Sequence, residues 1–113
     1  MHILKAPLIL SLFLITACSP HPGTGEWAST ADNKLAIKKI SVFFTPKVLF
    51  YAEEIEEPVM QCGWWALDKK TIEMECVHLS NTEIKEKYQI EVVDDGKAEL
   101  SKEGVTITSL TRL

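Results

Sequence analysis

The chain has 113 residues, which is enough for one small domain. Its 12 Lys and Arg residues are outnumbered by 16 Asp and Glu residues, and the formal net charge is −4. Because a nucleic-acid partner requires a basic face that neutralises phosphates, this balance argues against one.

The N-terminal segment predicts a signal peptide. A short, weakly basic start that includes Lys5 is followed by an apolar run over residues 6–17. As a helix this run would be about 18 Å long, well short of the roughly 30 Å hydrocarbon core of a bilayer. It therefore indicates the core of a signal peptide over residues 1–17 and not a membrane-spanning anchor.

The end of this run, Ile15-Thr16-Ala17-Cys18, resembles the lipobox of bacterial prolipoproteins, in which an aliphatic and two small residues precede a cysteine. The resemblance implies that Cys18 receives a diacylglyceryl group, that the chain is cut just before it, and that the lipid anchors the protein in a cell-envelope membrane. In Gram-negative members of this group, an Asp directly after the cysteine favours retention in the inner membrane. Ser19 occupies that position here, so the resemblance implies that the protein is anchored in the outer membrane. The alternative is an ordinary secretory signal with Cys18 near its cleavage site.

Residues 18–24 predict a lipidated cysteine followed by a short linker. The stretch SPHPGT over residues 19–24 holds two prolines and a glycine, a composition typical of linkers. The chain thus divides into a signal peptide (1–17), the cysteine with its linker (18–24) and a single domain (25–113).

The domain from residue 25 onward is predicted to be all-β. Short runs of β-branched and aromatic residues alternate with turn signals, as in an antiparallel up-and-down meander. Residues 81–86 are compatible with an isolated turn of helix. The expected strands are residues 25–31, 35–45, 47–53, 58–67, 71–79, 86–93, 97–102 and 105–112.

Face parity predicts the register of the hairpin around residues 94–96. A three-residue loop there, with glycine at its last position, pairs Val92 with Ala98 and Ile90 with Leu100. Apolar side chains then share one face, whereas a two-residue turn would place Val92 opposite a glutamate.

The same argument predicts a cross-strand disulfide. A loop over residues 68–70 places Cys62 directly opposite Cys76, and an oxidising compartment allows the two to bond. The alternative is a metal site that adds His78 to the two cysteines. On a strand, however, Cys76 and His78 are about 7 Å apart, and no fourth ligand is evident.

Gly25-Glu26-Trp27 on the first expected strand, together with Arg112 on the last, resembles the structural signature of lipocalin and calycin barrels. The resemblance implies that the arginine packs across the indole at the closed end, a favourable cation–π pair. The family also implies an interior that holds a small hydrophobic ligand. Eight short strands leave little room for a cavity, so a curled sheet or partly open barrel is expected here.

Large apolar side chains occur on both faces of the hairpin over residues 40–51. The outward set is expected to be Phe43, Leu49 and Tyr51, joined by Trp65 from the next hairpin. Such a patch would form a contact surface for a protein or lipid. The alternative is that a loop or a second layer covers it. The inward set is expected to be Ile40, Val42, Phe44, Val48 and Phe50.

The domain carries no recognisable catalytic motif. His78 is its single histidine, and the acidic run over residues 53–57 is typical of a solvated loop. Neither a phosphate-binding glycine loop nor a calcium-loop spacing occurs. We therefore expect a protein without catalytic residues, metal or cofactor.

The leading hypothesis is a non-enzymatic, lipid-anchored envelope lipoprotein whose β domain binds another envelope component, foremost a protein, through its exposed aromatic face. The main alternative is a lipocalin-like binder of a small hydrophobic ligand. Two further alternatives are a lysozyme inhibitor and a surface-exclusion or secretion-accessory lipoprotein. The Ser-Gly-x-x-Tyr loop of one family of lysozyme inhibitors has no counterpart in this chain.

Overall fold

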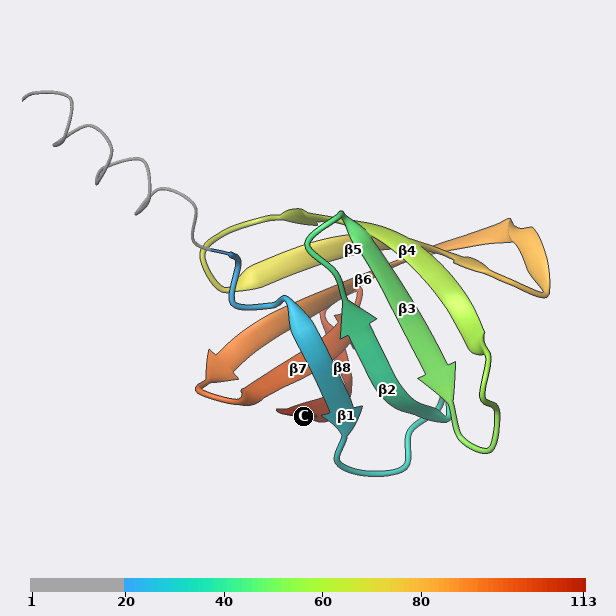
Figure 1. Cartoon of the computed structure of the whole chain (residues 1–113), viewed down its shortest axis with the longest axis horizontal. Coiled ribbons are helices and arrows are strands. Elements are labelled where there is room, and N and C mark those ends of the chain that lie inside the picture. Colours follow the sequence, from blue (N-terminus) through green and yellow to red (C-terminus); the bar gives the residue numbers. More distant parts are fainter. Residues whose placement is uncertain (1–19) are drawn as a thin grey trace, which may run out of the picture.

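The computed structural model describes residues 20–113, which form an eight-stranded antiparallel β-barrel (Figure 1). The predicted signal peptide and Cys18 lie outside these residues. Within residues 20–113, no helix is long and apolar enough to cross a membrane. The strands are β1 (Gly25–Ser29), β2 (Ile37–Val42), β3 (Lys47–Ala52), β4 (Pro58–Ala66), β5 (Thr71–His78), β6 (Asn81–Asp94), β7 (Lys97–Lys102) and β8 (Val105–Arg112).

The predicted antiparallel meander is confirmed, and the sheet closes completely instead of remaining curled or partly open. β1 has only 5 residues, yet it pairs with β2 on one side and with β8 on the other. Trp27 lies opposite both Ile40 and Arg112. Closure pairs the strand edges that an open sheet would expose. Short strands suffice because an eight-stranded barrel has an interior that side chains alone can fill.

Alternate residues of each strand point inward and fill the barrel. The largest of them are Trp27, Phe50 and Tyr88, and the rings of the last two have centroids 5.7 Å apart. The interior is therefore a packed hydrophobic core. Its members are Trp27, Ile37, Ile40, Val42, Val48, Phe50, Met60, Cys62, Ile72, Met74, Cys76, Tyr88, Ile90, Val92, Ala98, Leu100 and Leu110.

The hairpin between β6 and β7 has the register predicted from face parity, with the pairs Val92–Ala98 and Ile90–Leu100. Its turn is tighter than expected, because Asp94 pairs with Lys97. A register shift absorbs the additional residue, Val93, as a bulge within β6. Gly96 occupies the turn with a φ of 76°, a conformation that favours glycine.

Two expectations are wrong. β6 begins at Asn81, so residues 81–86 form a strand and not a helical turn; the β5–β6 hairpin they extend projects beyond the barrel (Figure 1). Cross-strand pairs such as Val77–Lys85 override the local helical preference. Phe44 is 74% exposed and does not face the core. β2 ends at Val42, so the strand alternation that would turn Phe44 inward stops before it.

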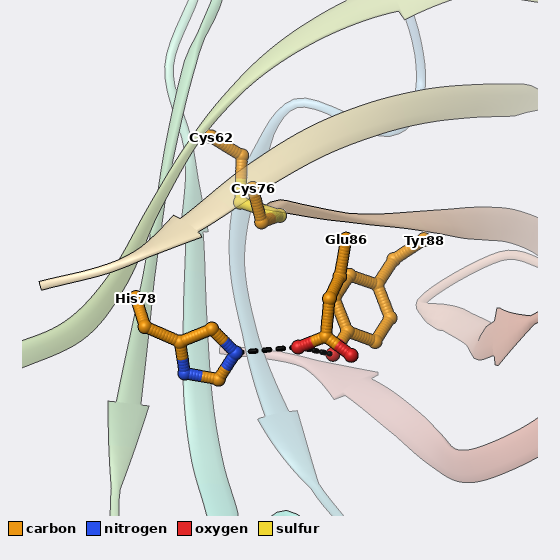
Figure 2. Close-up of a disulfide and its surroundings, with 5 residues drawn as sticks. All are labelled: Cys62, Cys76, His78, Glu86 and Tyr88. Atoms are coloured by element: carbon orange, nitrogen blue, oxygen red, sulfur yellow. Dashed lines mark hydrogen bonds and ion pairs between the residues drawn. A yellow bond between two sulfur atoms is a disulfide. The ribbon is translucent and has the colours of Figure 1, made fainter. Parts of the chain in front are cut away.

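The predicted disulfide between Cys62 and Cys76 is confirmed (Figure 2). The two residues are directly opposite on β4 and β5, with their Cα atoms 4.0 Å apart. Both lie in the core. Because their sulfur atoms are bonded to each other, they are not thiolate ligands for a metal beside His78.

The two ends of the barrel differ, and we name them for the rest of the description. The turns after β2, β4 and β6 lie at the end where β1 begins, together with residues 20–24; this is the plugged end (Figure 1). The turns after β1, β3, β5 and β7 lie at the opposite end, which is the mouth.

Removing the disulfide with the double substitution Cys62→Ala and Cys76→Ala should lower the free energy of unfolding by about 3 kcal/mol. This is the chain-entropy value for a loop of about 15 residues, and the two cysteines are 14 positions apart. Urea denaturation of both proteins measures the difference. Reduction of the native protein should lower its stability by a similar amount, and an unchanged midpoint would contradict the prediction.

Candidate functional site

The plugged end is organised around Trp27. Its indole is fully buried, and its Nε1–H donates a hydrogen bond to the Gly23 carbonyl at 3.0 Å. The Arg112 guanidinium lies over the ring, with Cζ 4.2 Å from the ring centroid. This is the cation–π contact expected from the sequence pattern.

Arg112 also fixes the chain that enters the barrel. Its Nη1 donates to the Thr24 carbonyl at 2.7 Å and its Nη2 to the Pro22 carbonyl at 2.6 Å. Gly25 makes room for this contact, because a Cβ there would lie 2.7 Å from Nη1, and its φ of 116° also favours glycine. The structure thus brings together Gly25, Trp27 and Arg112, the three residues singled out as structural.

Residues 21–24, which the sequence places in the linker, pack against this end. The ring of His21 accepts a hydrogen bond from the Gly23 N–H at Nδ1 (2.9 Å), so Nε2 carries the proton and donates to the Asp68 carbonyl at 2.8 Å. The same ring lies 6.0 Å from that of Trp64. Gly23 itself is buried. The folded part of the chain therefore begins close to Cys18.

A polar cluster lies at the mouth beside the disulfide (Figure 2). Glu86, opposite Cys76 in the sheet, accepts hydrogen bonds from His78 Nε2 and Lys102 Nζ. The Tyr88 hydroxyl donates to the same carboxylate at 3.3 Å. Three side chains, one each from β5, β6 and β7, thus converge on one acid.

This network shifts the pKa values of Glu86 and Tyr88 in opposite directions. The hydrogen bond from His78, followed in size by that from Lys102, holds the pKa of Glu86 at about 2, well below its usual 4.5. Burial, followed by the charge of Glu86, raises the pKa of Tyr88 to about 12. A carboxylate that binds protons this weakly is a poor general base near neutral pH, and a phenol that retains its proton is a poor nucleophile. The cluster is suited to holding the mouth together.

Two shallow hollows flank the cluster. One, of about 350 Å³, is lined by Leu35, Tyr88, Lys102, Val105 and Ile107 among others. The other, of about 550 Å³, is lined mainly by charged side chains such as Glu73, Lys87 and Glu103. The first therefore combines apolar side chains with the paired charges of Glu86 and Lys102.

The four residues predicted to point outward do so, and we call them the aromatic flank. Phe43 and Trp65 are 40% and 41% exposed, whereas Leu49 and Tyr51 are half-buried. Phe43 and Trp65 lie at the plugged end, Leu49 midway along β3 and Tyr51 nearer the mouth. Lysine ammonium groups lie over two of the rings, Lys47 over Phe43 at 4.9 Å and Lys39 over Tyr51 at 4.5 Å.

Sequence reasoning missed the cluster around Glu86 and two exposed residues at the plugged end, Phe44 and Leu67. The cluster has a signal in strand parity, since His78, Glu86 and Tyr88 occupy inward positions of β5 and β6 near their hairpin. Leu67 is 49% exposed in the β4–β5 turn, where no periodicity applies.

The described residues contain no group of three or more His, Cys, Asp or Glu side chains arranged to hold a metal ion. A comparison of the chain with protein-family models, curated proteins and solved structures gives no match. The fold defines the class of the protein, a small antiparallel barrel closed between its first and last strands.

The substitution Glu86→Gln should flatten the pH dependence of stability. Ionised Glu86 stabilises the fold above its unfolded pKa of about 4.5, and this contribution is lost as the pH falls through about 2. The free energy of unfolding should therefore fall more steeply between pH 4.5 and 2 in the native protein than in the variant.

At neutral pH the same variant should be less stable by about 1 kcal/mol, a modest loss because His78 and Lys102 are partly exposed to water. Urea denaturation at a series of pH values measures both effects. Parallel pH profiles for the two proteins would refute the assignment.

Proposed function

We propose that the protein is a non-enzymatic, lipid-anchored lipoprotein of the cell envelope whose barrel contacts another envelope component through its outer surface. The observation that carries this proposal is the contrast between a filled interior and an exposed aromatic flank. Core side chains occupy the inside, while Phe43 and Trp65 remain about two-fifths exposed. Exposed aromatic groups are characteristic of contact surfaces.

The anchor in this proposal is the thiol of Cys18. Its support is the lipobox-like sequence Ile15-Thr16-Ala17-Cys18. Acyl chains contribute about 0.8 kcal/mol per buried methylene, so two or more of them hold a protein stably at a membrane. Ser19, in place of Asp, supports the outer membrane as the destination in a Gram-negative cell.

The substitution Cys18→Ser tests the anchor. In a Gram-negative host fed a palmitate analogue, the native chain should incorporate the label and fractionate with the outer membrane. The variant should lose the label and the membrane association yet keep its fold, because the strands of the barrel begin at Gly25. A variant that stays bound to the membrane would contradict the proposal.

The same cells test the contact surface. A photo-crosslinking amino acid at Tyr51, on the aromatic flank, should form adducts with an envelope component. The same group at Glu99 on β7, four strands away around the barrel, serves as the matched control. Equal crosslinking at the two positions would show that the flank has no special role.

A second candidate function is the binding of a small hydrophobic ligand, as in lipocalin-like barrels. The contact of Arg112 with Trp27 beside Gly25 supports the resemblance to that family. Because the interior is filled, a ligand would bind at the mouth, in the hollow lined by Leu35, Tyr88 and Lys102.

Native mass spectrometry tests this second function. Protein purified gently from the envelope should retain a small-molecule adduct if the barrel is a carrier. Leu35→Ala, in the lining of the hollow, should release that adduct, whereas Tyr51→Ala, on the outer surface, should not. A bare protein that also fails to take up added hydrophobic ligands would remove this candidate.

A further inference from the structure

Exposed apolar side chains gather in the turns at the plugged end. Phe43 and Phe44 lie in the β2–β3 connection and are 40% and 74% exposed. Trp65, at the end of β4, and Leu67, in the turn that follows, are 41% and 49% exposed. Two turns that are distant in sequence thus present large apolar groups at the same end of the barrel.

The lipid anchor is joined to this same end by a very short stretch of chain. Three residues after Cys18, His21 is fixed to the barrel by its hydrogen bond to the Asp68 carbonyl in the β4–β5 turn. Three residues of backbone span at most about 11 Å. The Cα atom of His21, and with it the β4–β5 turn that it contacts, is therefore held within about 11 Å of the Cα atom of Cys18, plus the length of one hydrogen-bonded contact.

A reach of about 11 Å is comparable with the thickness of the headgroup region of a membrane. The headgroup region of each leaflet is roughly 5–8 Å thick, and apolar faces of peripheral proteins insert about 5–10 Å into it. Aromatic side chains are enriched at this depth. Side chains that project from the turns of the plugged end are therefore within reach of lipid.

We propose that the plugged end docks on the membrane that holds the anchor, with Phe43, Phe44, Trp65 and Leu67 inserted among the lipid headgroups. The inference rests on the proposed lipidation of Cys18. It names the membrane as the partner of Phe43 and Trp65, the two residues of the aromatic flank at the plugged end. Because the chain as a whole is acidic with a net charge of −4, its net charge does not draw it to anionic lipid, and docking depends on the apolar side chains. Lys69 and Lys70, which follow Leu67 and Asp68 in the β4–β5 turn, are exposed and would be available to lipid phosphates in this pose.

Docking in this pose fixes the direction of the mouth. The mouth is at the opposite end of the barrel axis, so the polar cluster around Glu86 and its two hollows point away from the bilayer. Tyr51, nearer the mouth, also stays clear of lipid and remains available to another envelope component.

Fluorescence quenching on the full lipidated protein tests the pose. The chain has three cysteines; two form the disulfide and Cys18 is acylated, so an introduced cysteine is the single free thiol. Thr45→Cys places an environment-sensitive dye in the β2–β3 turn without altering the aromatic groups, and Ser80→Cys places it in the β5–β6 turn at the mouth. Both native residues are small, exposed and hydroxyl-bearing.

The proteins are reconstituted in vesicles of phosphatidylethanolamine and phosphatidylglycerol that carry a nitroxide-labelled lipid. The dye at position 45 should be quenched, and the dye at position 80 should keep its fluorescence. Equal fluorescence at the two positions in protein that floats with the vesicles would overturn the docking inference and leave the lipid anchor intact. Protein that carries no acyl chain and does not float would overturn both.

Phe44→Asp in the Thr45→Cys background should abolish the quenching while the protein still floats. Leu79→Asp, an equivalent change at an exposed apolar residue near the mouth, should leave the quenching unchanged. Quenching that survives Phe44→Asp would overturn insertion through the aromatic groups. A dye at position 45 that is shielded only when a second envelope protein is added would assign this end to a protein partner instead.

Discussion

The contact of Arg112 with Trp27 is the interaction on which the closure of the barrel depends. Arg112 belongs to the last strand and Trp27 to the first, and the two lie opposite each other in the sheet. The guanidinium stacks on the indole and donates to the Thr24 and Pro22 carbonyls. A cation–π contact contributes about 0.5–2 kcal/mol, and the planar fork satisfies two carbonyls that a lysine could not reach together. One side chain thus joins both strands and the entering chain.

This closure makes the two ends of the barrel chemically different. At the plugged end, the backbone of residues 21–24 covers the core, and buried polar atoms bond to main-chain groups. At the mouth, side chains supply the hydrogen-bond partners of the polar groups, because Glu86 accepts from His78 and Lys102. A covered end and a polar end thus enclose the filled core from both sides. The disulfide lies between them and ties β4 to β5.

Local periodicity was sufficient to predict much of the fold. Parity of inward positions predicts the pairing of Cys62 with Cys76, because a slip of one residue would move every apolar side chain to water. Complete closure was not predictable in this way, since it depends on β1 meeting β8, 80 residues apart in sequence. The cluster around Glu86 was not predicted for a similar reason, because its side chains come from three strands. The exposure of Phe44 was not predicted because the alternation of inward and outward residues ends with β2, at Val42.

The proposed acylation of Cys18 would limit how this barrel can be used. A barrel on a long flexible linker would expose every face equally, whereas His21, three residues after Cys18, is hydrogen-bonded to the barrel and would hold one end at the bilayer if Cys18 is acylated. Exposed Phe44 at that end is then shielded from water, which removes the cost of leaving a large apolar group in solvent. Exposure of the same ring in a free soluble domain would have no compensating contact. What sets the plugged end apart is that exposed aromatic groups, Phe43, Phe44 and Trp65, lie there beside the entering chain, and this combination is what supports the proposed membrane contact.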